Sequence, residues 1–307
     1  MIGRMLFLTL IGLILSACSM SSSTTSETQG VASPSALAAT PSNSPLPGPT
    51  QRSATAVVLD FTQTPEFNTT LISPDSDTPA LAASLTTTPE ETQPPGGQSI
   101  TIKSADGLEI AASFYAPWES EPPWPGVILL HMIYGSRADW EGPAQALAFA
   151  GYAVLSVDMR GHGDTGGEAD WTQTASDLKQ VWQYFAERPE VDETRTAFIG
   201  ASMGANMALW AAAEETGVRT VVLLSPGLSY FGVEADRALD DYIQRTLMII
   251  ASSEDTYSAE SSQKLAWLAG DLAELVMYNG AGHGTDMFDH EDGLIDVIIQ
   301  WLDRGLN

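Results

Sequence analysis

The sequence has little positive charge and almost no cysteine. The chain of 307 residues carries 13 Lys and Arg residues against 39 Asp and Glu residues, which gives a formal net charge of −26. Such a charge repels DNA and RNA, so we expect no nucleic-acid partner. The single cysteine, Cys18, cannot form an intramolecular disulfide, and a metal site made of cysteines is excluded. The folded part must therefore depend on a packed apolar core.

The long apolar run of a membrane-spanning helix is also missing. The run at residues 5–15 follows the basic residue Arg4 and is shorter than the roughly 20 residues that cross a bilayer. This pattern is typical of a signal peptide, which we assign to residues 1–18. Leu15-Ser16-Ala17-Cys18 resembles the bacterial lipobox, whose cysteine is lipidated and becomes the new N-terminus. The resemblance implies a lipid anchor on Cys18 in a bacterial cell envelope; an ordinary secretory signal is the alternative.

Residues 19–98 lack the apolar content that a domain core needs. Roughly half of them are Ser, Thr, Pro or Gly, and Arg52 is their only basic residue. Such a segment cannot bury enough apolar surface to offset its conformational entropy. We therefore expect a disordered linker over residues 19–98 and a folded domain over residues 99–307.

Short apolar runs alternate with helical patterns from residue 99 onward. The Asp106-Gly107 pair between the first two runs is a hairpin signal, and the middle runs are continuously apolar, as in strands covered on both faces. This alternation predicts an α/β fold whose mostly parallel sheet of eight strands has helices on both faces. The expected strands are 99–103, 109–115, 126–131, 152–158, 196–200, 220–225, 246–251 and 274–278, and the expected helices are 138–150, 172–187, 203–215, 258–269 and 289–304.

One pentapeptide carries a candidate nucleophile. Gly200-Ala201-Ser202-Met203-Gly204 lies between an expected strand and an expected helix, the context in which Gly-x-Ser-x-Gly forms a sharp turn that exposes its serine. Side chains two positions before and after the serine would collide with the neighbouring strand and helix. The turn also lies at the edge of the sheet where ligands bind in α/β folds. We therefore expect Ser202 to be a catalytic nucleophile.

A serine nucleophile needs a base, and the base needs a carboxylate that orients it. The chain has 4 His, and His283 alone follows the last expected strand in a loop that returns to the edge of Ser202. Asp255 follows the strand 246–251, so Ser202, Asp255 and His283 occur in the chain order of nucleophile, acid and base. Glu254 is a near competitor for the acid, and Asp286 is a more distant one.

From about residue 99 onward these features resemble the α/β-hydrolase superfamily, in particular its dienelactone-hydrolase-like and small serine esterase branches. Further matches are the segments 125–131, 151–154 and 158–163. The resemblance implies an oxyanion hole formed by the N–H of Met203 and an N–H of the loop after the third strand, that of Ile133 or alternatively of Met132. This loop departs from the common His-Gly pattern because His131 is followed by Met132. Dienelactone hydrolase itself uses a cysteine nucleophile, so Ser202 favours an esterase.

The expected function is therefore hydrolysis of small carboxylic esters, with short acyl groups, through an acyl-enzyme on Ser202. The short interval between residues 225 and 246 predicts no large lid and an open site. We expect neither a cofactor nor a metal ion, and Asp158, Arg160 and the glycines around His162 are expected to fix a loop below the site. Cleavage of peptides, thioesters or polyesters by the same residues, and a noncatalytic binding lipoprotein, are the alternatives. The aromatic residues that could line the site are Tyr134, Trp140, Tyr230, Phe231, Tyr257 and Phe288.

Overall fold

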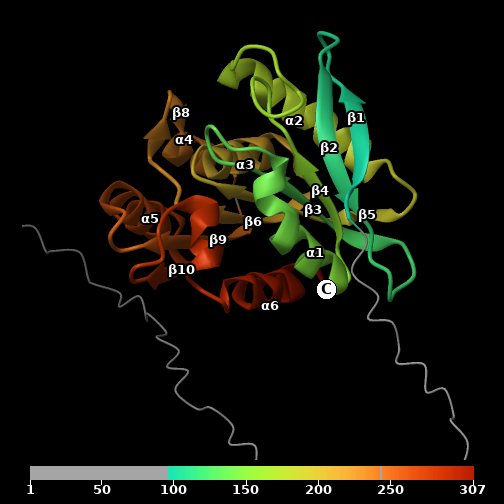
Figure 1. Ribbon diagram of the computed structural model, residues 1–307. Helices are drawn as coiled ribbons and strands as arrows, with labels where there is room; N and C mark the ends of the chain where they lie inside the picture. The colour runs from blue at the N-terminus through green and yellow to red at the C-terminus, as the bar shows by residue number, and fades with distance from the viewer. Residues whose placement is uncertain (1–95, 243) are drawn as a thin grey trace, which may run out of the picture. The chain divides into compact units, whose positions relative to one another are not determined.

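The computed structural model describes residues 96–242 and 244–307 (Figure 1). The predicted signal peptide, Cys18 and nearly all of the predicted linker lie outside the described residues. The first strand begins at Gln98, one residue before the expected start of the folded domain.

Eight strands form one mixed sheet, which confirms the predicted fold class. Their order across the sheet is β1-β2-β4-β3-β5-β6-β9-β10. The strands β1 and β2 form an antiparallel hairpin, β2 pairs antiparallel with β4, and all the other neighbours are parallel. The bounds are β1 Gln98–Lys103, β2 Glu109–Tyr115, β3 Trp124–Leu130, β4 Ala153–Val157, β5 Val191–Ala201, β6 Val218–Leu224, β9 Thr246–Ser252 and β10 Ala273–Tyr278.

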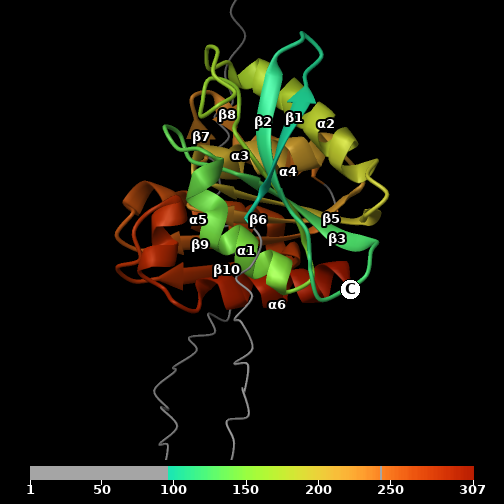
Figure 2. The same ribbon diagram turned by 45° about the vertical axis from the view of Figure 1, so that its right-hand side comes forward.

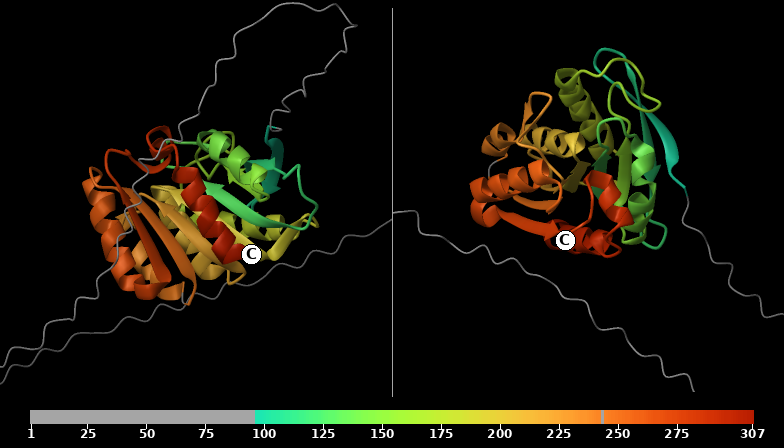
Figure 3. Two further views of the ribbon diagram at one scale, coloured as in Figure 1. Left: turned by 90° about the horizontal axis from the view of Figure 1, so that it is seen from below. Right: turned by 60° about the vertical axis from the view of Figure 1, so that its left-hand side comes forward.

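Helices cover both faces of the sheet. One face packs against α2 (Trp171–Ala186), α3 (Met203–Glu214), α4 (Ala235–Asp241) and α5 (Thr256–Ala269), and the other packs against α1 (Glu141–Phe149) and α6 (Leu294–Leu306). Figure 3 shows α6 lying across the strands, and its residues Leu294, Ile298, Trp301 and Leu302 are buried there as their helical spacing predicts.

The central strand β3 shows why the middle strands have no polar face. Val127 and Leu129 belong to the core under α1 and α6, whereas Ile128 and Leu130 belong to the core under α2 and α3. All four side chains are fully buried. Because successive side chains of a strand point to opposite faces, a strand covered on both sides must be apolar throughout.

The structure contains small elements that the sequence patterns do not predict. Between β6 and β9 lie a two-stranded hairpin, β7 (Ser229–Tyr230) and β8 (Val233–Glu234), and the short helix α4. This segment is far smaller than a lid domain, which agrees with the expected absence of a large lid. The predicted last helix also starts too early, because Gly284–Asp289 forms a 3-10 turn and α6 begins only at Leu294.

Candidate active site

Ser202 lies in a strained turn between β5 and α3. Its backbone has φ 54° and ψ −118°, a conformation that residues other than glycine rarely adopt. Such strain persists only where the surrounding structure imposes it, and it is concentrated at functional sites. Here the Ser202 N–H donates to the carbonyl of Leu224 at the end of β6, 2.8 Å away. The turn therefore fixes the serine at the carboxyl edge of the sheet.

The two glycines of the pentapeptide are both required by close packing. A Cβ atom on Gly200 would collide with the carbonyl of Gly204, and a Cβ atom on Gly204 would collide with the carbonyl oxygens of Leu130 and His131. The first turn of α3 thus lies directly against the end of β3. This confirms the steric reason that the sequence pattern suggests for small residues around Ser202.

Asp255 and His283 are joined by a hydrogen bond of 2.5 Å between Oδ2 and Nδ1. Asp255 follows β9 and His283 follows β10, so both lie at the carboxyl edge of the sheet, as Ser202 does. The competing carboxylate Glu254 accepts a hydrogen bond from the Ser252 hydroxyl instead, and this contact is the main cause of its lowered pKa. Asp286 contacts His283 through its backbone N–H, which donates to the His283 carbonyl. Asp255 is therefore the carboxylate that holds the imidazole.

Ser225, which the sequence analysis did not single out, connects the loop of His283 to the loop of Ser202. It follows β6 directly, has φ 49°, and accepts a hydrogen bond of 2.9 Å from the Gly284 N–H on its hydroxyl. Gly284 also packs against Ala201, the neighbour of Ser202. The hydrogen bonds of the described residues do not include one between the Ser202 hydroxyl and His283. Contacts of this kind often tighten only when substrate binds.

Tyr230 of the small hairpin donates its hydroxyl to the Ser225 carbonyl over 3.4 Å, at the end of β6 that also holds the Ser202 turn. The hydroxyl lies 3.0 Å from the Ser258 hydroxyl, which in turn donates to the carbonyl of Ser225. Burial raises the pKa of Tyr230, whereas hydrogen bonding to Ser258 and, to a smaller extent, to Ser202 opposes the rise. The sequence could offer Tyr230 only as one of several aromatic candidates, because nothing in its local pattern indicates that a hairpin forms there.

The loop after β3 presents a backbone turn next to Ser202. The Gly135 N–H donates to the Met132 carbonyl, and the His131 Nδ1 lies 2.6 Å from the same oxygen. The carbonyl and the N–H of a trans peptide point in opposite directions, so the Ile133 N–H faces away from these two groups. The Met203 N–H belongs to the first turn of α3 and has no acceptor within the helix. Of the amides that the resemblance names, those of Met203 and Ile133 thus have no backbone acceptor among the described residues.

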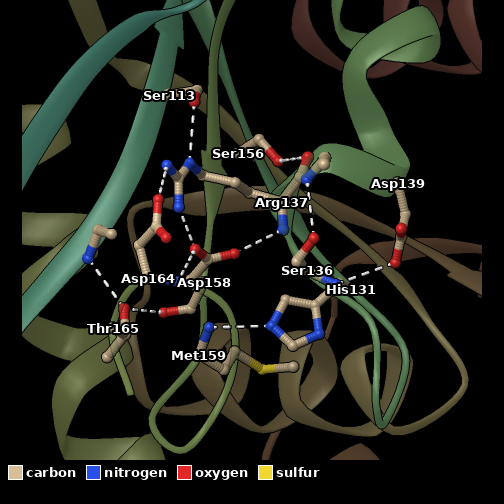
Figure 4. Close-up of polar contacts among 12 residues, drawn as sticks. Ser113, His131, Ser136, Arg137, Asp139, Ser156, Asp158, Met159, Asp164 and Thr165 are labelled. Carbon is tan, nitrogen blue, oxygen red and sulfur yellow. Dashed lines mark hydrogen bonds and ion pairs between the residues drawn. The ribbon is translucent and has the colours of Figure 1, made fainter.

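Both ends of this loop are anchored to the end of β4 (Figure 4). At one end the Met159 N–H donates to His131 Nε2 over 3.0 Å. At the other end the buried Asp158 carboxylate accepts hydrogen bonds from the backbone N–H of Arg137, over 2.6 Å, and from its guanidinium. The Asp164 N–H bonds to the same carboxylate over 2.8 Å. These contacts support the structural role expected for Asp158.

The neighbouring Arg160 has a similar structural role. Its guanidinium forms a two-pronged pair with Asp177 at 2.7 and 2.8 Å and a further ion pair with Asp106 at 2.9 Å. Hydrogen bonds from Arg160 and Ser104 hold the pKa of Asp106 well below its usual range. Arg160 therefore joins α2 to the β1–β2 hairpin and is not aimed at Ser202.

His131 is a buried histidine whose protonation state follows from its partners. Because Nε2 accepts a hydrogen bond from Met159, the proton of the neutral ring lies on Nδ1, which donates to Met132. Burial lowers the pKa of His131, and the nearby His162 lowers it further. The imidazole therefore remains neutral and keeps the Met132–Ile133 peptide in one orientation.

The aromatic candidates divide into a buried and an exposed group. Trp140 is fully buried and packs edge-on against Phe288, so the expectation that it could line the site is wrong. Tyr134 is 90% exposed and Phe231 is 64% exposed. Tyr257 is partly exposed, and its hydroxyl bonds to both the N–H and the carbonyl of Ser229 in the hairpin.

Neither a membrane-spanning helix nor a group of metal ligands is found in the described part of the chain. No helix within residues 96–242 and 244–307 is both long and apolar enough to cross a membrane. The same residues contain no cluster of three or more His, Cys, Asp or Glu side chains suited to a metal ion.

Comparisons with known proteins identify the fold. Residues 125–240 match the family described as alpha/beta hydrolase fold. An esterase of Pyrococcus furiosus superposes with a TM-score of 0.60 at 19% identity, over 69% of this chain and 91% of that chain. The chain has the α/β-hydrolase fold. A dienelactone hydrolase of Anabaena variabilis is another α/β-hydrolase neighbour, with a TM-score of 0.55 at 19% identity, over 69% of this chain and 97% of that chain.

In sequence, the α/β-hydrolase chain is 27% identical over 226 residues to an uncharacterized protein of Mycobacterium tuberculosis. That alignment covers 68% of this chain and 80% of its relative. The family match includes Ser202 but ends before Asp255 and His283. The evidence that Asp255 and His283 lie at the sheet edge of Ser202 therefore comes from the structure and not from the family match.

Proposed function

We propose that this α/β-hydrolase fold carries a serine hydrolase that cleaves carboxylic esters with short acyl groups. The observation that supports the proposal most is the hydrogen-bonded pair of Asp255 and His283 at the sheet edge where Ser202 is held in a strained turn. Three loops bring nucleophile, base and acid to one edge in the chain order typical of this fold. The esterase of Pyrococcus furiosus has the same fold, and its activity favours ester substrates here.

In the proposed mechanism His283 takes the proton of the Ser202 hydroxyl as the oxygen attacks the ester carbonyl. Nδ1 of His283 is held by Asp255, so Nε2 is the atom that receives the proton. The oxyanion accepts hydrogen bonds from the N–H groups of Met203 and Ile133, each worth about 3 kcal/mol in the transition state. His283 then protonates the departing alcohol, and water releases the acid from the acyl-enzyme through the same base.

The contacts of Met132 indicate which backbone N–H is the second donor of the proposed oxyanion hole. The Met132 side chain packs against Gly284, next to His283, and the Met132 carbonyl is engaged by His131 and Gly135. The Ile133 N–H is thereby preferred over that of Met132 as the second donor. Because the Met132 side chain lies against Gly284, we infer that it limits the space beside the imidazole and so favours small acyl groups.

The proposed location is the bacterial cell envelope. A lipid on Cys18 would attach the chain to a membrane, and residues 19–98 would separate the hydrolase domain from the membrane surface. Incorporation of labelled palmitate into the wild-type chain expressed in bacteria, lost in Cys18→Ala, tests this proposal. An equally labelled variant would refute it.

The catalytic proposal is tested by ester hydrolysis together with active-site labelling. We expect p-nitrophenyl acetate to be hydrolysed by the wild type, and kcat/KM to fall by roughly 10³-fold or more in Ser202→Ala. A fluorophosphonate probe should label the wild type and leave Ser202→Ala unlabelled. Labelling without ester hydrolysis would favour a peptide, thioester or polyester substrate, whereas a wild type that fails both tests would favour a noncatalytic binding protein.

A further inference from the structure

Backbone strain in the described residues is concentrated around Ser202. Five residues other than glycine have positive φ in the described part of the chain, and four of them follow strands at the sheet edge of Ser202: Tyr134, Ser202, Ser225 and Phe231, the fifth being Gln244 before β9. Ser202 is the proposed nucleophile, and Ser225 fixes the loop of His283. Tyr134 and Phe231 have no such role, yet Tyr134 follows Ile133, a proposed oxyanion donor, and Phe231 follows Tyr230, whose hydroxyl bonds to the Ser225 carbonyl beside the Ser202 turn. Their conformations therefore require another explanation.

Both aromatic residues occupy turn positions that favour glycine or asparagine. Met132 to Gly135 form a turn closed by the hydrogen bond from Gly135 to Met132, and Tyr134 is its third residue with φ 64°. Phe231 and Gly232 connect β7 and β8 and have φ 49° and 83°, the pattern of a type I′ hairpin turn. Asn or Gly is usual at both places because their conformation costs least there.

Neither aromatic side chain is buried in compensation for this strain. Tyr134 is 90% exposed and Phe231 is 64% exposed. The ring of Phe231 touches Trp171, with centroids 6.1 Å apart, and Trp171 continues through His162 to His131 at distances of 5.7 and 5.0 Å. This series of rings links the hairpin to the base of the proposed oxyanion loop.

The two turns lie at the same edge of the sheet and are both held firmly. Figures 1 and 2 show the loop after β3 beside the β7–β8 hairpin. The buried Asn206 side chain of α3 donates to the carbonyls of Gly227 and Val233, both over 2.9 Å, and so fixes the base of the hairpin. The turn of Tyr134 is anchored through His131 and Arg137 as described above. The aromatic rings thus project from rigid supports, on two loops at the sheet edge where Ser202 lies.

We propose that Tyr134 and Phe231 form a subsite for an aromatic ring of the ester that Ser202 attacks, an inference that rests on the proposed function. Two exposed rings at the sheet edge of the nucleophile offer stacking surface to a flat apolar group. The net charge of −26 disfavours an anionic substrate, so neutral esters are suitable probes of this subsite. Strained, exposed aromatic residues that add nothing to the core are understandable if they bind substrate.

The test compares three neutral esters with the full chain. Benzyl acetate carries a ring on its alcohol side, its isomer methyl phenylacetate carries one on its acyl side, and ethyl acetate has none. In Phe231→Asn we expect kcat/KM for at least one aromatic ester, relative to ethyl acetate, to fall about tenfold, mainly through KM. The melting midpoint should be unchanged or higher, because the turn then has the favoured Asn-Gly sequence. Tyr134→Asn should act in the same direction.

Phe149→Asn is the matched control, because Phe149 is 63% exposed at the end of α1, away from the carboxyl edge of the sheet. It should leave the ratio of aromatic to ethyl ester unchanged. If Phe231→Asn and Tyr134→Asn also leave both ratios unchanged, the subsite does not exist.

A binding measurement separates failure of the subsite from failure of the proposed function. N-benzylacetamide is titrated by NMR into Ser202→Ala with and without Phe231→Asn, so no catalysis is needed. An affinity at least several-fold weaker in the double variant supports the subsite even if the wild type hydrolyses none of the esters. Equal affinities overturn it even if the wild type is an active esterase.

Discussion

Removal of the Ser225 hydroxyl should damage both the stability and the activity of the protein. This hydroxyl accepts the Gly284 N–H at 2.9 Å and lies 3.7 Å from the Met287 sulfur, in a fully buried position. In Ser225→Ala the Gly284 N–H keeps no acceptor and cannot reach water. The loop that carries His283 then loses its attachment to the end of β6.

A buried donor left without a partner costs about 1–3 kcal/mol. In a domain of about 200 residues this lowers the melting midpoint by roughly 2–12 °C, since each kcal/mol corresponds to about 2–4 °C. Displacement of the His283 loop by about 1 Å would reduce kcat by about 10²-fold. Thermal unfolding followed by circular dichroism and ester hydrolysis at saturating substrate measure the two effects separately.

Ser262→Ala is the matched control for this experiment. Ser262 is fully buried in α5, but its hydroxyl has no hydrogen-bond partner among the described residues. Its removal leaves no backbone group unpaired, and alanine has the higher helix propensity, so stability should be unchanged or slightly higher. If Ser225→Ala and Ser262→Ala unfold at the same temperature, the hydrogen bond to Gly284 contributes nothing and the reasoning is refuted.

Three further predictions concern the acid, the serine turn and the buried histidine. Asp255→Asn should lower kcat by about 10³–10⁴-fold while Glu254→Gln stays within a few-fold; the reverse result would exchange their roles. Gly204→Ala should unfold at least about 1–3 kcal/mol more easily in urea, because its Cβ meets the Leu130 carbonyl; an unchanged midpoint would contradict this contact. Burial lowers the pKa of His131 in the folded state. As pH falls below about 6.5, the unfolded state therefore binds a proton on His131 that the folded state does not bind, and the free energy of unfolding decreases. Urea titrations from pH 8 to 5 should therefore show a steeper loss of stability in the wild type than in His131→Asn, and parallel curves would rule this out.

The sequence predicts the strands best where both faces are covered. Runs such as the one in β3 are apolar throughout, and only a buried strand accommodates them. The first part of β5 is missed because residues 191–195 are mostly polar, and their strand conformation comes from pairing with Trp124 and Pro125 of β3. The β7–β8 hairpin is missed because its strands are two residues long and its turn contains Phe231, a residue unusual in such turns.

The sequence likewise predicts some residues of the candidate site and misses others. The strand, turn and helix around Ser202 follow from a local pattern, and chain order suggests His283. Choosing between Asp255 and Glu254 needs three-dimensional geometry, since both follow β9 and only their hydrogen bonds tell them apart. The contribution of Ser225 is invisible in the sequence because it depends on two loops that are distant along the chain.

The proposed base and nucleophile are attached to parts of the sheet with very different protection from solvent. Ser202 follows the central strand β5, whereas His283 follows the edge strand β10, none of whose residues is buried. Edge elements with few buried contacts open locally at a lower free energy than the central core does. Amide hydrogen exchange should therefore be faster in β10 than in β5. Rising denaturant should separate the base from an intact Ser202 turn, so activity should vanish while most of the sheet is still folded.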